Sequence, residues 1–467
     1  MRRTTPANCR YVSRLPGPRQ SVIWSIIVTL ALSSALGLQH ALFAQSLETK
    51  NPVTKSTEKQ AAKSSRLKSV GAKEQTSKLP SGFNPPQQIL PVMTLEKELL
   101  TKQEEARFRK TGLLKRYRDS LKSLNPTEKD KDAIAQGAVW HLKRMSMKKY
   151  RNALPSLRQE ILRDLLLYAR QSPAARKELL QQLTSKSELL FDNNFYVRLN
   201  AVILLTQLNL VEPKGDVELV AYVPVAKPLL KIVKDKKQLD PIKVQAVKGL
   251  TRICRLGALP LTDEIRPEIA VALVAELARQ GTHWWYQMRL AEGLAACGVA
   301  SNPSNRDDAM VVNSLSQTMS NEKRHWIARS AAAKALGRVP LEKAANHSLE
   351  SLVYWTIELA YRMSQDFDKN PEQSFWRVCY ENVYLAFHAL NTDESKRRAG
   401  FLQKGGGQNY VQGAYEIIVP LVKYIRDTTP PKQFPREIVR PIKDWLKRNE
   451  PPKPIPEVTE TSETSSE

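Results

Sequence analysis

The sequence predicts an all-α protein, a right-handed α-solenoid in which pairs of helices stack one after another. First, a helical motif recurs within residues 195–205, 240–250, 284–294 and 326–336, and its terminal leucines lie 45, 44 and 42 residues apart. A period of this size is typical of helix pairs that each bury an apolar face against the next pair. Second, glycine and proline mostly fall between the periodic segments, where they end helices. Third, strand signals are weak, and the best of them, at 217–223, is short.

The N-terminus has the order of a secretory signal. Residues 1–20 contain five arginines and no acidic residue, an apolar run follows at 22–38, and small residues suited to cleavage end at Ala44. This order directs export, so we expect removal of residues 1–44 and a periplasmic or extracellular location. The apolar run of about 17 residues is at the lower limit for crossing a bilayer. A retained N-terminal membrane anchor is therefore the alternative.

Composition divides the rest of the chain. Residues 45–94 form a basic linker rich in Ser, Thr and Lys, and residues 449–467 are Pro-rich and then acidic. Neither segment can bury enough apolar surface to offset its chain entropy, so both are predicted to be disordered. Between them we expect basic N-terminal helices that cap the solenoid at 95–172, repeats at 173–391 and a C-terminal helical cap at 392–448.

Helical patterns cover this body in order. The first stretches are 96–124 and 128–147, and 157–168 places its apolar residues on one helix face. From residue 174 onward the helices form pairs, the first of each pair outer and the second inner. The predicted pairs are 174–187 with 195–209, 224–235 with 240–256, 265–280 with 284–297, 308–320 with 325–338, 348–364 with 375–390, and 409–426 with 436–448.

The repeated segments resemble HEAT repeats, which belong to the armadillo-like α-solenoids. The segment that runs from Trp326 to Gly337, Trp-Ile-Ala-Arg-Ser-Ala-Ala-Ala-Lys-Ala-Leu-Gly, follows the aromatic-x-small-Arg and Ala-Leu-Gly signature of that family. The resemblance covers 174–390 and, more loosely, 128–172 and 409–448. It implies a curved solenoid whose second helices line a concave binding face. It implies no chemistry, because a fold does not fix a function.

Basic residues concentrate on the predicted inner helices and in residues 107–158, which contain 15 basic and 4 acidic residues. Equivalent positions of successive repeats line up, so these cations would form a ladder that attracts an anionic partner. The other interpretation is a solvated surface with local ion pairs, and with some arginines packed between helices. The candidate binding cations are Arg198, Lys243, Lys248, Arg252, Arg289, Arg329 and Arg377.

An aromatic group is the most distinctive local feature, and it recurs at the predicted starts of inner helices. Aromatic side chains on adjacent repeats could form a groove for a partner peptide or stack on sugars. The other interpretation is core packing at the helix starts. The candidate residues are Trp284, Trp285, Tyr286, Trp326 and Trp376.

Cys254 and Cys297 occupy nearly equivalent positions in successive repeats. Neighbouring helices pack about 8–10 Å apart, whereas a disulfide needs Cα atoms within about 7 Å. We therefore expect these cysteines to act as small buried side chains. With Cys379 they make an odd number in a compartment that permits disulfides.

The function that these features favour is a non-enzymatic, exported scaffold that binds another protein. One alternative is a binder of an anionic polymer or membrane surface through a basic face. Another is an enzyme, or an enzyme's accessory module, with a pocket on the concave face. No catalytic, cofactor or metal motif is present in the sequence, and the export signal argues against a nucleic-acid partner. After cleavage of the signal we expect no membrane span.

Overall fold

The computed structural model describes residues 97–302, 304–305, 307–341, 347–388, 400–404, 407–427 and 433–449. These residues belong to one compact unit within Lys78–Glu467. The predicted signal at 1–44, the linker at 45–94 and the tail after Asn449 lie outside the described residues. Within the described part no helix is long and apolar enough to cross a membrane.

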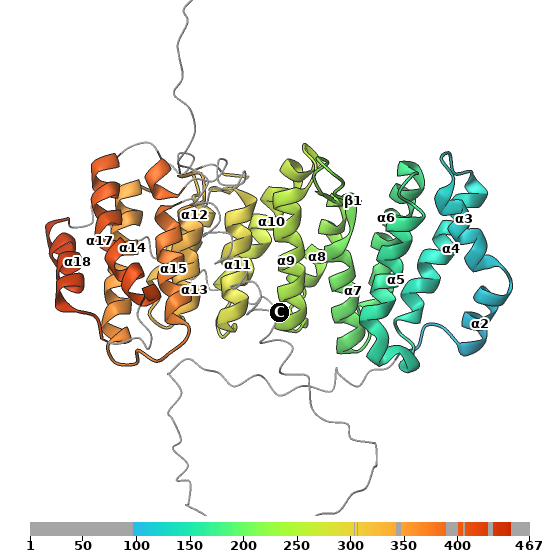
Figure 1. Cartoon of the computed structure of the whole chain (residues 1–467), viewed down its shortest axis with the longest axis horizontal. Coiled ribbons are helices and arrows are strands. Elements are labelled where there is room, and N and C mark those ends of the chain that lie inside the picture. Colours follow the sequence, from blue (N-terminus) through green and yellow to red (C-terminus); the bar gives the residue numbers. More distant parts are fainter. Residues whose placement is uncertain are drawn as a thin grey trace, which may run out of the picture. The chain divides into compact units, whose positions relative to one another are not determined.

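The described part is all-helical apart from one two-stranded sheet (Figure 1). The N-terminal helices are α2 (Lys102–Lys110), α3 (Leu113–Lys122), α4 (Glu128–Arg144) and α5 (Leu154–Leu167). The next are α6 (Pro173–Lys186), α7 (Phe195–Gln207), α8 (Ala226–Lys234), α9 (Asp240–Leu256), α10 (Leu261–Ala278) and α11 (Trp284–Cys297). The last are α12 (Met310–Ser320), α13 (Trp326–Leu336), α14 (Leu349–Phe367), α15 (Trp376–Phe387), α17 (Gln408–Asp427) and α18 (Arg436–Arg448).

Short elements connect some of these helices. Strand β1 (Asn209–Val211) pairs antiparallel with β2 (Val220–Ala221) between α7 and α8. The weak strand signal at 217–223 thus contributes a two-residue strand. The 3-10 turns are η2 (Lys148–Ala153), η3 (Ser187–Leu190), η4 (Val223–Val225) and η6 (Phe401–Gln403).

The stretch expected as one helix at 96–124 is two helices. Gly112 has a φ of 76°, a left-handed conformation that ends α2, because side chains larger than hydrogen disfavour it. Thr101 begins α2 and Thr127 begins α4, and each forms a capping box with the acidic residue three positions later. These caps satisfy the backbone N–H groups at the helix starts.

The six predicted helix pairs match helices α6 to α18 to within a few residues. The second helices pack on one another in chain order, α7 on α9, α9 on α11, α11 on α13 and α13 on α15. The first helices form a similar series, in which α8 packs on α10, α10 on α12 and α12 on α14. Within a pair, α8 contacts α9, α10 contacts α11 and α12 contacts α13.

The two ends of this series depart from the predicted pairing. The helix α6 packs mainly on α4, while α7 packs on α5 and α9, and η3 contacts both α6 and α7. In the last pair the order is reversed. The helix α17 packs on the second helix α15, and α18 packs on the first helix α14.

Glycines allow the closest approach between neighbouring helices. A Cβ on Gly249 would lie 2.7 Å from Thr206 of α7 and 2.7 Å from Leu229 of α8. A Cβ on Gly293 would lie 3.3 Å from Thr251 of α9 and 2.7 Å from Leu273 of α10. The same contact thus recurs one helix pair later, as the spacing of the sequence motif predicts.

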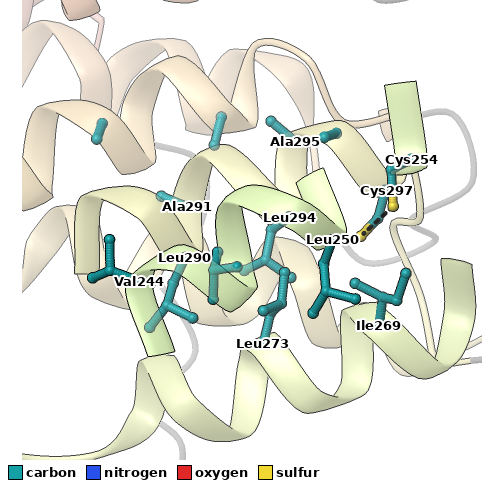
Figure 2. Close-up of a cluster of buried hydrophobic side chains, with 14 of the residues drawn as sticks. Val244, Leu250, Cys254, Ile269, Leu273, Leu290, Ala291, Leu294, Ala295 and Cys297 are labelled. Atoms are coloured by element: carbon teal, nitrogen blue, oxygen red, sulfur yellow. Dashed lines mark hydrogen bonds between the residues drawn. The ribbon is translucent and has the colours of Figure 1, made fainter. Parts of the chain in front are cut away.

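Leucines, isoleucines and alanines fill the space beside these glycines. Figure 2 shows Leu250, Leu290 and Leu294 of the second helices facing Ile269 and Leu273 of α10. All five side chains are fully buried. The apolar face of each helix is thus covered by the neighbouring helices, which is the main source of stability in this arrangement.

Candidate functional site

Three of the candidate cations lie inside the protein. The side chains of Arg198, Lys243 and Arg329 are 6%, 0% and 3% exposed. Each stands seven residues before the terminal leucine of its motif, and Gln287 at the same position of α11 is also buried. These cations therefore cannot form a surface ladder, and that part of the expectation is wrong. The alternative interpretation, polar side chains packed between helices, fits their positions.

Each of these buried groups has a specific partner, as burial of a polar group requires. Arg198 donates to Gln238 Oε1 at 2.9 Å, and Arg329 Nε donates to the Met319 carbonyl at 2.9 Å. The guanidinium of Arg329 also lies over the Trp326 ring, 4.2 Å from its centroid. Burial lowers the pKa of Arg329 to about 10. These contacts connect the second helices to neighbouring turns and helices.

Lys243 is paired with Glu276 of α10, and its Nζ lies 2.9 Å from Oε1. Burial lowers the pKa of Lys243, although the carboxylate of Glu276 acts in the opposite direction. The candidate aromatic residue Tyr286 belongs to the same group, because its hydroxyl donates to Glu276 Oε2 at 2.9 Å. Tyr286 is fully buried, so it is a packing residue and offers no surface to a partner.

Three other candidate aromatics, Trp284, Trp326 and Trp376, make ring contacts at the starts of α11, α13 and α15. The Trp284 ring stacks on His325 with 5.3 Å between centroids, and His325 meets the edge of Phe375 at 4.9 Å. Trp326 lies 6.1 Å from Trp376. Trp376 is buried, whereas Trp284, Trp285 and Trp326 are half-buried against the core. The aromatic group is thus a row of ring contacts across three helix starts, with Trp284, Trp285 and Trp326 half-buried.

Two histidines of this row have a role that the sequence analysis missed. Nδ1 of His283 accepts a hydrogen bond from the Trp285 backbone N–H at 3.2 Å. Nδ1 of His325 accepts from the Ile327 N–H at 3.1 Å in the same way. Both residues are therefore N-caps. Burial, aided by the charge of His283, lowers the pKa of His325 to about 4. The His-Trp pair that recurs directly before an Ala-rich helix was the sequence signal that could have predicted these N-caps.

Of the remaining candidate cations, Lys248, Arg252 and Arg289 belong to a basic face on the second helices, and Arg377 of α15 is outside it. Lys248 and Arg377 are exposed, and Arg252 and Arg289 are half-buried. Arg252 is held in place, because it donates to the carbonyl of Thr206 at 3.2 Å and to the Asn209 side chain.

Lys334 of α13 lies at the centre of this face. Burial lowers the pKa of Lys334, and the positive charges of Arg338 and of Arg255 on α9 lower it further. Glu292 of α11 and Glu381 of α15 act in the opposite direction. Charged groups from α9, α11 and α15, together with Arg338 two residues after α13, therefore act on one lysine. We define the basic face by its cations, which are Lys248, Arg252, Arg255, Arg289, Lys334 and Arg338.

Cations outnumber carboxylates on the basic face. Burial lowers the pKa of Lys248, the charge of Arg289 lowers it further, and Glu292 partly offsets these effects. Arg289 and Glu292 pair within α11, with 2.6 Å between Nη1 and Oε2. An anionic group placed on this face would relieve the repulsion between its cations.

The basic segment 107–158 is partly neutralised by a buried acidic residue just before it. Glu105 of α2 is buried, forms ion pairs with Lys149 and Arg144, and accepts a hydrogen bond from Tyr150. Other cations of the segment, such as Lys110 and Lys115, are exposed. The segment therefore has a positive surface, but its buried Arg144 holds α2 against the end of α4.

One buried pair resembles part of a catalytic group. His141 Nε2 lies 3.0 Å from Asp164 Oδ2, and these side chains are 3% and 1% exposed. Their ring and carboxylate are closed off from solvent between α4 and α5. The pair therefore stabilises the packing of these helices.

No cofactor or metal site stands out in the part of the chain that the structure describes. No group of three His, Cys, Asp or Glu side chains is placed to hold a metal ion in these residues. An open depression of about 560 Å³ on α8 and α10 is lined by Lys227, Lys231, Lys234 and Glu268, among others. Its Lys231 and Lys234 form ion pairs with Glu188 and Glu268.

Comparison with protein-family models, curated proteins and solved structures gives no match for this chain.

Proposed function

We propose that this protein is an exported, non-enzymatic scaffold, a right-handed HEAT-like α-solenoid that binds an acidic segment of a partner protein through the basic face. The observation that carries the proposal is the interaction between cations of neighbouring second helices: Arg255 of α9 and Arg338 after α13 act on Lys334, and Arg289 of α11 acts on Lys248. The recurring contacts of Gly249 and Gly293 support the repeat architecture. The secretion signal predicted at residues 1–44 supports export.

The basic face suits a protein segment better than a flat anionic surface. Its cations are partly desolvated, as the lowered pKa values of Lys248, Arg252 and Lys334 reflect. Partly buried cations strengthen short-range pairing with carboxylates, because the local dielectric constant is lower than in water. Half-buried aromatic residues at the starts of α11 and α13 offer apolar contacts on two of the same helices.

The test is capture of partners from a cell-envelope extract by immobilised full-length protein. We compare the wild type with the double variant K248E/K334Q on the basic face. The matched control is K227E/K236Q, which makes the same change of charge at two exposed lysines of α8 and the loop after it. We expect a discrete protein that the wild type and the control retain and that K248E/K334Q loses.

The salt dependence and a lipid assay separate this proposal from its alternative. A protein partner held by desolvated pairs is expected to survive washing at moderate salt. The second assay is co-sedimentation with vesicles that contain anionic lipid. Binding of a membrane surface would be favoured if the wild type and both double variants bind the vesicles and all lose them at the same salt concentration. Equal capture of the protein by all three forms would contradict the assignment to the basic face.

A further inference from the structure

We propose that Cys254 of α9 and Cys297 of α11 form a reversible disulfide that cross-links these two helices. Their Sγ atoms are 3.7 Å apart, and Figure 2 shows the two sulfur atoms facing each other at the end of the buried cluster. A disulfide bond is about 2.05 Å long, so a small movement of the two side chains brings the sulfurs to bonding distance. Both residues are at most 1% exposed.

The packing of α9 against α11 explains this proximity, which the usual spacing of helices did not predict. Gly293 and Thr251 meet where a Cβ on the glycine would be 3.3 Å from the threonine hydroxyl. Cys297 follows Gly293 by four residues and Cys254 follows Thr251 by three, so each cysteine lies about one turn further on the same helix face. The close approach that glycine allows therefore extends to the two thiols.

The surroundings favour a disulfide over other roles for these thiols. The neighbouring side chains Leu250, Leu294 and Ala295 are apolar and buried. No cluster of three metal-binding side chains exists in the described residues, so the pair is not part of a metal site there. Cys379 on α15 is also buried, and burial raises the pKa of its thiol to about 12. Cys379 thus serves as an internal control.

The oxidation requires a disulfide oxidant, either a small-molecule disulfide or a protein disulfide. One protein thiolate attacks the oxidant and forms a mixed disulfide, which releases the first oxidant thiol. The second protein thiolate then attacks the protein sulfur of the mixed disulfide, forms the Cys254–Cys297 bond and releases the second oxidant thiol. The two cysteines lose two electrons and two protons, and the oxidant gains them.

The cross-link would fix the two helices that supply most of the basic face, since Lys248 and Arg252 are on α9 and Arg289 is on α11. It would close a long loop of the chain, which stabilises the folded state. This inference stands on the position of the thiols and does not depend on the partner proposed for the basic face.

The experiment refolds the full-length protein, because the thiols are buried once the protein is folded. Reduced, unfolded protein is diluted into buffers with a graded ratio of glutathione disulfide to glutathione, and the remaining thiols are then alkylated. After trypsin digestion the cross-link joins the peptide Ile253–Arg255 to the peptide Leu290–Arg306. We expect this linked peptide to become the main form of both cysteines as the ratio rises. We also expect the oxidised protein to melt several degrees above the reduced protein.

The variants C254A and C297A provide the controls. Each is expected to give no linked peptide and a melting temperature that does not change with the glutathione ratio. The proposal is overturned if refolded wild type with a native circular dichroism spectrum retains both cysteines as thiols, or carries only glutathione on them. Equal linkage of Cys254 to Cys9 or Cys379 would overturn it too.

Discussion

Lys243 and Glu276 form an ion pair in the interior that joins α9 to α10, with 2.9 Å between Nζ and Oε1. The carboxylate of Glu276 also accepts a hydrogen bond from the Tyr286 hydroxyl at 2.9 Å and one from Arg279 at 2.6 Å. A single acidic side chain therefore connects α9, α10 and α11. Removal of Glu276 leaves the Lys243 ammonium buried without its counterpart, whereas removal of Lys243 leaves Glu276 paired with Arg279.

The first prediction concerns this pair. Glu276→Leu should lower the free energy of unfolding by about 3–5 kcal/mol, because it leaves the Lys243 ammonium buried and unpaired. The double variant K243M/E276L should lose less than the sum of the single variants. Urea unfolding of both single variants and the double variant gives the coupling energy. For comparison, Lys234→Met at the exposed pair with Glu268 should cost less than about 1 kcal/mol. Strictly additive losses at Lys243 and Glu276 would contradict the assignment.

The second prediction concerns tight packing in α13. Ala332 is fully buried, so Ala332→Asp places a carboxylate among apolar side chains and should lower the melting temperature strongly or prevent folding. Ala174→Asp is the matched control, since Ala174 is exposed in the first turn of α6, where an acidic side chain is tolerated. Thermal unfolding followed by circular dichroism checks both. An unchanged melting temperature for Ala332→Asp would count against the packing described.

The third prediction concerns the glycines between helices. Gly249→Ala and Gly293→Ala should each cost about 1–3 kcal/mol, because the added Cβ would lie 2.7 Å from a leucine of the paired helix. Gly413→Ala in α17 meets nothing closer than 3.8 Å and should instead stabilise by about 0.5–1 kcal/mol, as alanine favours a helix. Chemical unfolding of the three variants measures these differences. The same sign for all three would show that close approach does not matter.

The fourth prediction is a pH dependence at the helix starts. The folded-state pKa of His325 is lowered to about 4 from 6.5 by burial and by His283. The unfolded state therefore binds more protons between these values, and the stability that neutral His325 contributes is lost as the pH falls from about 6.5 to 4. The loss should be about 2–3 kcal/mol. His325→Asn keeps a capping side chain that does not titrate.

This prediction is checked by the difference between wild type and His325→Asn, since carboxylates titrate in the lower part of the same range. Urea unfolding at pH 7, 6, 5 and 4 should give a wild-type stability that falls more steeply than that of the variant. His388→Asn is the control, because His388 is exposed and begins no helix. Parallel curves for wild type and His325→Asn would mean that His325 titrates normally.

The positions of most helices could be predicted from the sequence, because local patterns set them. Apolar residues at helical spacing, capping residues such as Thr127 and the glycines and prolines between segments act within a few residues. Ala201, Ala246 and Ala332 each stand four residues before the terminal leucine of their motif, and all three are buried. Gly112 divides a stretch that was predicted as one helix. The sequence did not reveal this, because in a charged segment a left-handed glycine is hard to distinguish from an exposed helical glycine.

The candidate site could be predicted only in part. Arg329 and Lys248 are both cations of second helices, yet one is buried over Trp326 and the other is exposed. Which cation is buried depends on whether a neighbouring turn supplies a partner, such as the Met319 carbonyl or Glu276. Such partners are 10 and 33 residues away in the chain, beyond the reach of local patterns.

The sequence alone thus determines the order of helices along the chain and their apolar faces, because backbone hydrogen bonding and side-chain periodicity are local. The reversed packing of α17 and α18, the 3.7 Å between Cys254 and Cys297, and the burial of Lys243 arise from contacts between helices. Those contacts depend on side-chain volumes at facing positions, such as Gly293 against Thr251. Packing of this kind is a property of several helices together, and it sets which charged groups remain at the surface to meet a partner.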